Sequence, residues 1–224
     1  MDVEDAKRRA GEAAAERVED GTTVGLGSGS TAAHAIRALG ERVEAGLEVD
    51  GVATSYQSRA VARAAGIDLV EPEDVEAVDV AIDGADQVAD GNLIKGGGGA
   101  HAREKLIDAA AGEFLVVVDE RKLADALGAA VPLAVLPPAR ALVGGDVAAL
   151  GGEATLRGAA EKSGPVVTDN GNLLLDCDFG RIDDPAELAA ELDALPGVVE
   201  HGLFVGLADA VYVGTGDGVR TREG

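Results

Sequence analysis

The chain has 224 residues, with 41 acidic and 19 basic side chains and a formal net charge of −22 at pH 7. Such a charge repels the phosphate backbone of nucleic acids and anionic membrane surfaces, so we expect neither as a partner. A chain of this length buries one large core, or a main domain with a smaller one appended. Abundant Ala, Val and Gly with almost no aromatic residues indicate a high-salt cytoplasm.

Targeting and redox features also predict a soluble, cytoplasmic protein. The first twenty residues carry acids throughout, which favours an amphipathic helix over a signal peptide. The longest mostly apolar stretch, residues 126–143, is interrupted by prolines and an arginine and does not suit a membrane span. The single cysteine, Cys177, is interpreted as a packing residue. We expect no metal, because His34, His101 and His201 are scattered along the sequence and form no ligand cluster. We also expect no cofactor.

The first part of the chain alternates helices with strands. Helical spacing predicts helices at residues 3–18, 32–39 and 55–65, and a further helix after the glycine run 96–99. Short apolar runs predict strands at residues 22–26, 51–54, 67–70, 78–82 and 113–118. Such alternation is typical of a parallel, doubly wound sheet, so we predict an α/β fold with a Rossmann-like domain.

The pattern changes after residue 130. Strands are predicted at 131–136, 153–157, 166–168, 173–175 and 198–204, and helices at 139–150 and 185–195. A turn at 169–172 makes 166–168 and 173–175 a hairpin. With one of these five strand assignments left open, the order is β-α-β-β-α-β, which predicts a smaller, ferredoxin-like α+β lid domain. A last strand at 210–213 is expected to return to the first sheet, which gives a catalytic domain at 1–130 plus 206–224 and a lid at 131–205.

Residues 83–105 contain the densest chemistry of the chain. Asp83 follows a buried strand, and open α/β sheets bind ligands at the carboxyl ends of their strands. The glycine run 96–99 is either a flexible loop or a turn that feeds a helix and favours an anion. Glu104 alone is typical of a solvated helix residue, but its closeness in sequence to Asp83, Asp86 and Lys95 makes it a candidate. We expect Lys95 to be an exposed loop lysine.

A second glycine loop occupies residues 27–31. It lacks the lysine of a Walker A loop and the third glycine of the dinucleotide fingerprint, and Asp50 lies toward the wrong end of its strand for ribose binding. These departures disfavour a nicotinamide cofactor. The loop could hold a phosphate through its amide and hydroxyl groups, and Ser30 or Thr31 could cap the next helix. Both can be true, because capping and anion binding use the same backbone donors. Lys122 also follows a predicted strand, and is either a surface lysine or a site lysine.

With these residues the chain resembles ribose-5-phosphate isomerase of type A, over essentially its full length. The matching motifs are Gly27-Ser28-Gly29-Ser30-Thr31, Asp83-Gly84-Ala85-Asp86, Lys95-Gly96-Gly97-Gly98, Arg103-Glu104-Lys105 and Val167-Thr168-Asp169-Asn170-Gly171-Asn172. The resemblance implies a homodimer or homotetramer without a metal. It also implies interconversion of ribose 5-phosphate and ribulose 5-phosphate, a step of the non-oxidative pentose phosphate pathway.

Residue roles follow from the same resemblance. It implies Glu104 as the proton acceptor, with Asp83, Asp86 and Lys95 as further catalytic residues. The implied substrate-binding residues are Lys7, Ser28, Gly29, Ser30, Thr31, Asp83, Gly84, Ala85, Asp86, Lys95, Gly96, Gly97, Gly98 and Lys122. Ser28 replaces the Thr of many members and keeps a hydroxyl. His101 and Ala102 also depart from the family pattern, which puts the loop packing in doubt.

The chemistry explains why these residue types are needed. Moving a proton between C2 and C1 requires one base that reaches both carbons on one face of a cis-enediolate, and a desolvated carboxylate such as Glu104 suits that task. Lys95 and the glycine amides would stabilise the enediolate oxygen. Asp83 or Asp86 would move protons between O1 and O5 to open the furanose ring, and the sequence does not say which.

Two alternatives compete with this function. One is another sugar-phosphate enzyme of the same fold, such as an amino-sugar phosphate deaminase or a lactonase, which the lid and the Lys95 motif disfavour. The other is a non-catalytic sugar-phosphate sensor, which usually carries a DNA-binding module. The sequence contains no helix-turn-helix pattern and no basic face. Conversion of ribose 5-phosphate to a ketose by the purified protein distinguishes the sensor from the enzyme.

Overall fold

The computed structural model describes residues 2–161 and 163–224 and divides the chain into two compact units. The first unit comprises Met1–Ala85, Arg103–Leu123 and Gly206–Gly224, and the second comprises Asp86–Ala102 and Ala124–Val205. The boundaries predicted from the sequence had assigned residues 86–102 and 124–130 to the first domain. The chain therefore passes from one unit to the other inside the Asp83-Gly84-Ala85-Asp86 motif, and returns immediately before Arg103-Glu104-Lys105.

A seven-stranded sheet forms the centre of the first unit. Its order is β14 (Val219–Glu223), β13 (Ala210–Gly214), β7 (Ala111–Asp119), β4 (Val78–Gly84), β1 (Thr22–Leu26), β2 (Val49–Ala53) and β3 (Asp68–Val70). The strands are parallel except β14, which pairs antiparallel with β13. The predicted doubly wound sheet and the returning strand 210–213 are confirmed. The edge strand β14 was missed because its exposed, charged residues lack a buried apolar face.

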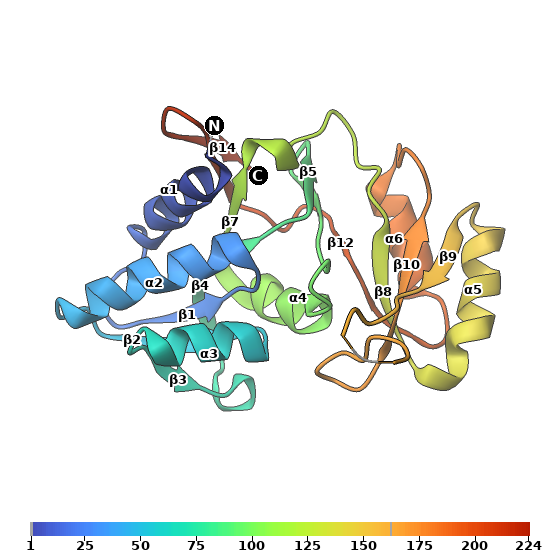
Figure 1. The fold of residues 1–224 in the computed structure, drawn as a ribbon, viewed down its shortest axis with the longest axis horizontal. Helices are drawn as coiled ribbons and strands as arrows, with labels where there is room; N and C mark the ends of the chain where they lie inside the picture. The colour runs from blue at the N-terminus through green and yellow to red at the C-terminus, as the bar shows by residue number, and fades with distance from the viewer. Residues whose placement is uncertain (1, 162) are drawn as a thin grey trace. The chain divides into compact units, whose positions relative to one another are not determined.

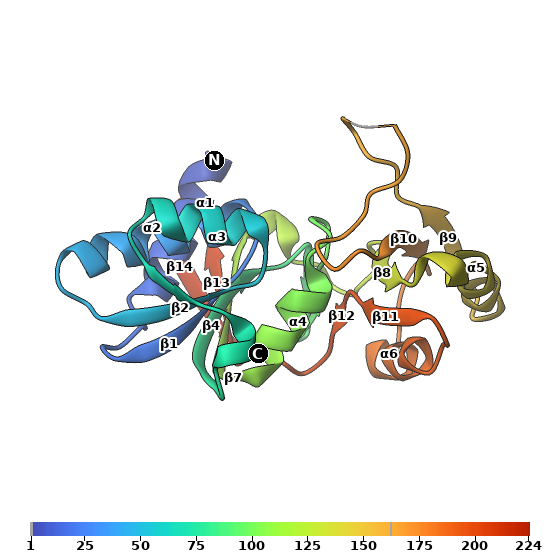
Figure 2. The same ribbon diagram turned by 90° about the horizontal axis from the view of Figure 1, so that it is seen from below.

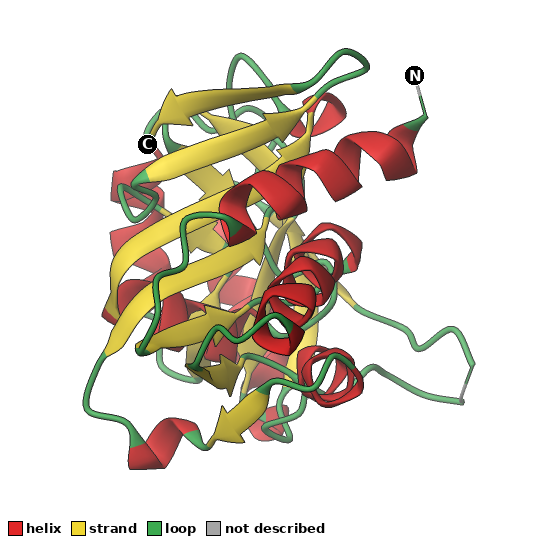
Figure 3. Ribbon diagram, turned by 90° about the vertical axis from the view of Figure 1, so that its left-hand side faces the viewer, coloured by secondary structure: helices red, strands yellow, loops and turns green. Residues whose placement is uncertain are grey.

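Helices cover both faces of this sheet (Figures 1 and 3). One apolar cluster joins Val24 and Leu26 of β1 to α1 (Val3–Ala15), α2 (Ser30–Glu44) and α3 (Tyr56–Ala64). The side chain between them, at Gly25, would point to the other face, where a Cβ would lie 2.7 Å from Ile107 of α4 (His101–Ala110). Strand alternation thus directs three helices to one face and α4 to the other. The predicted helix 3–18 is three residues shorter in the structure, and the predicted helix 32–39 is longer at both ends.

The second unit contains a four-stranded antiparallel sheet of order β11 (Val198–His201), β8 (Val131–Val135), β10 (Leu173–Asp178) and β9 (Glu153–Leu156). One face packs on α5 (Arg140–Ala149) and α6 (Pro185–Asp193) through a cluster that includes Leu133, Val143, Leu175 and Leu192. The chain order β8-α5-β9-β10-α6-β11 is the ferredoxin-like order expected from the sequence.

The predicted hairpin between 166–168 and 173–175 is confirmed only next to its turn. Val167 forms an antiparallel bridge with Leu173, but from Leu175 onward this edge of β10 pairs with β9 instead. The turn itself exists, since the Thr168 amide donates to the Asn172 carbonyl at 2.9 Å. The described residues of the connection between β9 and β10 on either side of position 162 extend away from the sheet (Figure 2).

The predicted strand 198–204 divides at Gly202, where a Cβ would collide with the Lys95 carbonyl. Residues Leu203–Phe204 form β12, which pairs with β6 (Asn92–Ile94). Together with β5 (Gln87–Ala89) these strands make a small third sheet that the sequence analysis missed. Three-residue strands are too short for an alternation signal. Among the described residues, no helix combines the length and the apolar character that a membrane crossing requires.

The excess of acidic side chains predicts a fold that weakens at low salt. A net charge of −22 repels itself over a Debye length that grows from roughly 3 Å at 1 M salt to 30 Å at 0.01 M. Pairs such as Arg8–Glu12 and Arg181–Asp183 are largely exposed and offset little of this repulsion. We expect the melting temperature, measured calorimetrically, to fall as NaCl is lowered across this range. A constant melting temperature would contradict the prediction.

Candidate active site

The first unit brings the glycine loop after β1 against the end of β4. These are neighbouring strands on either side of the point where the sheet order reverses, which is the usual ligand position in such sheets. The buried Asp83 carboxylate accepts the Ser28 amide at 2.9 Å and the Gly84 amide at 2.6 Å. A Cβ on Gly27 would collide with this carboxylate, so only glycine permits the approach. Asp83, Ser28 and Gly84 thus form one hydrogen-bonded group.

Side chains that follow β2 form hydrogen bonds with the loop before α2. Ser28 Oγ lies 2.9 Å from Thr54 Oγ1 and 2.6 Å from Ser55 Oγ, and the Gly29 amide donates to Gln57 Oε1 at 2.9 Å. Gly29 is the N-cap residue, with a φ of 97°, and among the described residues no side chain caps this helix. The alternative in which Ser30 or Thr31 is the cap is therefore wrong, because both lie inside α2. Helix amides without a side-chain cap favour an anion.

Glu104 lies in the first turn of α4 and is 5% exposed. It precedes Ile107 by three positions, and residues at that spacing share a helix face. Because Ile107 packs on the sheet at Gly25, Glu104 is directed to the same side. Asp108, four positions after Glu104, is 2% exposed and is a buried carboxylate that the sequence analysis overlooked. The spacing of Glu104 and Asp108 around the apolar Ile107 is the signal that could have revealed it.

Lys95 and Asp86 belong to the second unit. Lys95 is only 2% exposed, so the expectation of an exposed loop lysine is wrong. The Lys95 amide donates to the Gly202 carbonyl at 2.8 Å, and its Nζ lies 5.3 Å from the centroid of the Phe204 ring. The Asp86 amide donates to the Ile94 carbonyl at 2.8 Å, and its carboxylate accepts the Gly97 amide at 2.7 Å. Asp86 thereby joins the β5–β6 hairpin to the glycine turn.

The glycine run is an ordered turn that leads into α4. The Gly99 amide donates to the Gly96 carbonyl at 2.9 Å, and φ is 100° at Gly96 and 81° at Gly99. His101, the first residue of α4, is fully buried and its Nε2 accepts the Ala134 amide at 3.2 Å. A Cβ on Gly96 would lie 2.7 Å from His101 Nδ1. The departure from the family pattern at His101 is therefore accommodated by packing within the second unit.

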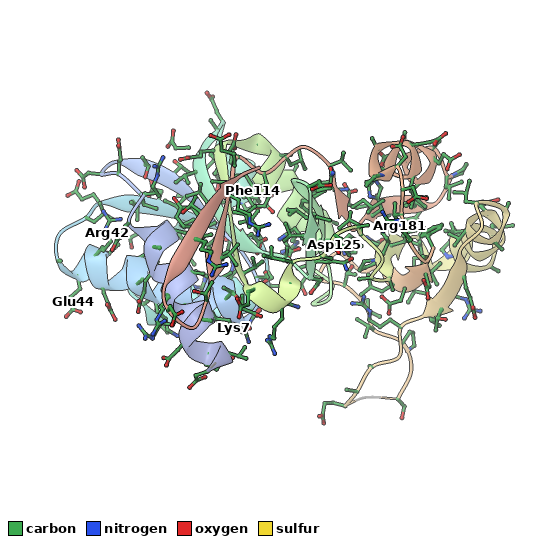
Figure 4. All side chains as sticks on the ribbon, turned by 90° about the horizontal axis from the view of Figure 1, so that it is seen from above. Lys7, Arg42, Glu44, Phe114, Asp125 and Arg181 are labelled. Atoms are coloured by element: carbon green, nitrogen blue, oxygen red, sulfur yellow. The ribbon has the colours of Figure 1, made fainter. Side chains whose placement is uncertain are left out.

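Lys7 lies on α1 of the first unit (Figure 4). Its Nζ donates to Glu4 Oε1 at 2.7 Å, and Glu4 Oε2 lies 3.5 Å from His34 Nε2, one turn into α2. The hydrogen bond from Lys7, followed by that from His34, lowers the pKa of the Glu4 carboxyl. Glu4 thus connects Lys7 to the first turns of α2.

Lys122 ends a short 3₁₀ helix, η2 (Glu120–Lys122), that follows β7. The buried Asp119 carboxylate caps η2 and accepts the Arg121 amide at 3.2 Å and the Arg121 Nε at 2.7 Å. Burial acts to raise the pKa of this carboxyl, but the hydrogen bonds and charge of Arg121 outweigh it, and the net effect is a lowered pKa. The segment that carries Lys122 is therefore anchored by a charged carboxylate.

Replacing Asp119 with Asn should destabilise the fold in a pH-dependent way. A carboxyl whose pKa is lowered by folding stabilises the protein above its unfolded pKa, and that contribution is lost as the pH falls through the folded pKa. At pH 7 we expect a loss of about 1 kcal/mol in the free energy of unfolding, because the amide weakens charge-assisted bonds to Arg121.

The measurement is urea unfolding at constant salt, with the exposed Asp125→Asn variant as control. Below the unfolded pKa of about 3.9, the difference in the free energy of unfolding between Asp119→Asn and the parent should shrink. The reason is that the Asp119 carboxyl of the parent then takes up a proton and becomes neutral, as the amide of the variant already is. An equal difference at pH 7 and pH 3 would contradict this account.

One group of described residues has the composition of a metal site. Ligand atoms of Asp193, Glu200 and His201 lie within 4.8 Å of one another. However, His201 Nδ1 accepts the Leu203 amide at 3.2 Å, so the proton of the neutral ring is on Nε2, which lies 3.2 Å from Asp193 Oδ1. In this arrangement the imidazole donates an N–H hydrogen bond to the Asp193 carboxylate, and its other nitrogen accepts the Leu203 amide. Neither ring nitrogen then offers a lone pair to a metal.

Cys177 packs among the apolar residues of the second unit, as predicted. Burial, followed by the nearby charge of Asp176, raises the pKa of its thiol to about 12. A thiol with this pKa is protonated at neutral pH, and the thiolate is the reactive form. Cys177 is therefore chemically inert.

Residues 50–218 match the family model of ribose 5-phosphate isomerase A (phosphoriboisomerase A). The chain belongs to this family. The ribose-5-phosphate isomerase A of Haloarcula marismortui is 65% identical over 217 residues, which cover 97% of this chain and 95% of that relative. The solved ribose 5-phosphate isomerase A of Methanocaldococcus jannaschii is 45% identical, with a TM-score of 0.95 and 99% coverage of each chain. A solved D-ribose-5-phosphate isomerase in complex with phospho-erythronic acid is 44% identical, with a TM-score of 0.97 and full coverage of both chains.

These findings confirm the resemblance and the fold class inferred from the sequence. The protein is an enzyme, an isomerase that acts on ribose 5-phosphate. Neither the sensor nor another sugar-phosphate enzyme is favoured. Relatives from halophilic archaea agree with the acidic, aromatic-poor composition.

Proposed function

We propose that Glu104 is the base that moves a proton between C2 and C1 of the open-chain sugar through a cis-enediolate. Its burial at 5% exposure and its place on the sheet-facing side of α4 support this role. A desolvated carboxylate is a stronger base than a hydrated one, and a rigid helix holds it in one position while both carbons react. One carboxylate oxygen can serve both C1 and C2, because the proton leaves one carbon and reaches the other on the same face of the planar enediolate.

The first turn of α2 binds the phosphate group in this proposal. The Ser30 and Thr31 amides and hydroxyls are the donors, and the positive end of a fifteen-residue helix adds favourable electrostatics. Lys7 supports the proposal through its connection to α2 by way of Glu4, and Lys122 supplies a further cation. In a protein of charge −22, such local cations offset the repulsion that an anionic substrate would otherwise meet.

Lys95 and the amide of Gly98 stabilise the negative charge that develops on the enediolate oxygen. The burial of Lys95 supports this role, because an ammonium in a water-poor place interacts more strongly with a developing oxyanion. One of the two aspartates, Asp83 or Asp86, moves protons between O1 and O5 during ring opening. Asp83 is buried and bonded to two amides, whereas Asp86 is partly exposed and bonded to one amide.

The observation that carries the mechanism is the buried carboxylate of Glu104 within the family motif Arg103-Glu104-Lys105. The experiment is isomerisation of ribose 5-phosphate in heavy water, followed by NMR of the product and of the recovered substrate. Proton transfer through a carboxyl group incorporates deuterium at C1 of ribulose 5-phosphate or at C2 of recovered substrate. Isomerisation without solvent deuterium at any conversion would indicate a hydride shift and would overturn the proposal.

We also propose that the enzyme works in the cytoplasm, in the non-oxidative pentose phosphate pathway, as a homodimer or homotetramer without metal, cofactor, nucleic acid or membrane partner. The family relationship supports the assembly and the pathway, and the charge of −22 argues against polyanionic partners. Sedimentation equilibrium at high salt measures the assembly directly, and a monomer at the concentrations of full activity would contradict it.

A further inference from the structure

Arg157, immediately after β9, contacts a carboxylate and two glycine carbonyls that lie far from it in the sequence. Its Nε lies 2.9 Å from Asp176 Oδ2, and its Nη2 donates to Asp176 Oδ1. The remaining group, Nη1, donates to the carbonyl of Gly96 at 3.0 Å and to the carbonyl of Gly97 at 3.0 Å. The side chain is 17% exposed, and all four residues belong to the second unit. The Nε and Nη2 edge of the guanidinium is fixed by the Asp176 carboxylate, and Nη1 holds the glycine turn.

Sheet geometry explains why Asp176 can hold Arg157 there. In β10, Leu175 and Cys177 face the cluster under α5 and α6, so Leu174 and Asp176 face the opposite side. The glycine turn lies on that opposite side, since a Cβ on Gly99 would be 2.9 Å from Leu174 Cδ1. Arg157 therefore bridges between the sheet and the turn.

These contacts set the direction of two consecutive peptide groups. In a planar trans peptide the C=O and the next N–H point in opposite directions. The Gly96 carbonyl points to Arg157, and the Gly97 amide of the same peptide donates to Asp86 on the other side. The Gly97 carbonyl also points to Arg157, so the Gly98 amide is directed to the side of Asp86 as well. A cation at the carbonyl end of both peptides further polarises their N–H groups.

We propose that Arg157, oriented by Asp176, is a positioning residue for the isomerisation. It holds the peptides of the glycine turn so that the Gly97 amide donates to Asp86 and the Gly98 amide faces the side on which it stabilises the enediolate oxygen. This inference rests on the proposed role of the Gly98 amide. Arg157 touches only the backbone of the turn and the carboxylate of Asp176 in these contacts, so it acts on the reaction through the turn.

The test compares Arg157→Lys, Arg157→Ala and Asp176→Asn with the control Arg181→Ala. Arg181 also pairs with a carboxylate in the second unit, Asp183 at 2.8 Å, but this pair is 68% and 82% exposed. A misplaced group costs up to about 10²-fold in rate, so we expect both Arg157 variants to lose about 10- to 100-fold in kcat at 2 M salt. KM should change by less than about threefold, because the phosphate-binding residues proposed above are not those that Arg157 contacts.

A lysine keeps the charge but lacks the planar fork, so Arg157→Lys should fail to restore kcat. Asp176→Asn should also lower kcat. The double variant Arg157→Ala/Asp176→Asn should have a kcat only slightly below that of Arg157→Ala, since the two residues act as one unit. Hydrogen exchange by mass spectrometry should show faster exchange at residues 96–99 in the Arg157 variants, while α5 and α6 keep their protection. Arg181→Ala should match the wild type in both measurements.

Wild-type kcat in Arg157→Lys and Arg157→Ala would overturn the inference. So would unchanged exchange at residues 96–99, or a kcat loss that only tracks the unfolded fraction measured by circular dichroism. If Arg157→Ala does not fold, Arg157→Lys and Asp176→Asn decide the matter by the same readouts. Failure of the proposed mechanism is distinguishable, because it would appear in the wild-type solvent-label experiment and in Glu104→Gln, whatever the Arg157 variants do.

Discussion

Glu104→Gln is expected to lower kcat for ribose 5-phosphate by at least about 10²- to 10⁴-fold, the usual contribution of a positioned acid–base group. Glutamine keeps the size and the hydrogen-bonding reach of the side chain but has no basic oxygen to accept the proton from C2. The fold should be preserved, because the substitution is nearly isosteric at a buried position. The affinity for substrate should change little, since the phosphate is bound elsewhere in the proposal.

The measurements for this variant are steady-state kinetics, and binding of a non-isomerisable sugar-phosphate analogue by calorimetry. The matched control is Glu44→Gln, an exposed glutamate at the end of α2 that should behave as the wild type (Figure 4). A Glu104→Gln enzyme with near-normal turnover would mean that another group is the base. Equal losses of binding and turnover would mean that Glu104 binds substrate without performing the proton transfer.

The parallel sheet was predictable because its strands are long apolar runs separated by helices with clear periodicity. Strands β4 and β7 contain the runs Val78–Ile82 and Phe114–Val118, and both appear where expected. The errors occurred where a strand's neighbours decide the outcome. Residues 166–168 have the composition of a strand, but from Leu175 onward β9 occupies the edge of β10 that they would need, and only the bridge from Val167 to Leu173 forms. Sequence periodicity contains no information on such competition.

The candidate site was predictable where its chemistry is continuous in sequence. Asp83, Lys95, the glycine run and Glu104 lie within one short segment, and polar residues after buried strands are recognisable as site residues. Arg157 was missed because its contacts with Gly96 and Gly97 span about sixty positions. The burial of Lys95 was missed for a related reason, since it depends on the pairing of β6 with β12 across more than a hundred residues.

Lys95→Met should lower kcat by about 10²- to 10³-fold, the loss typical of removing one donor that stabilises an oxyanion. Lys95 is buried and its ammonium lies over the Phe204 ring, so truncation to alanine alone would leave a cavity and mix a packing defect with the chemical one. Methionine fills a similar volume and makes favourable contacts with an aromatic ring, which preserves the packing while removing the charge. The melting temperature of Lys95→Met at high salt should therefore stay within a few degrees of the wild type.

A second variant separates the missing charge from any remaining change in shape. Lys95→Ala leaves room for a small amine, so added methylammonium should restore part of the lost kcat in this variant and none in Lys95→Met, where the space is filled. The restoration should follow the protonated amine as the pH is raised toward the pKa of the amine, because a cation is what the developing oxyanion requires. Tetramethylammonium, which has no N–H donor and is too large for the space, is the control. Undiminished kcat in Lys95→Met, or equal restoration by tetramethylammonium, would remove Lys95 from the chemistry and leave its ammonium as a packing partner of Phe204.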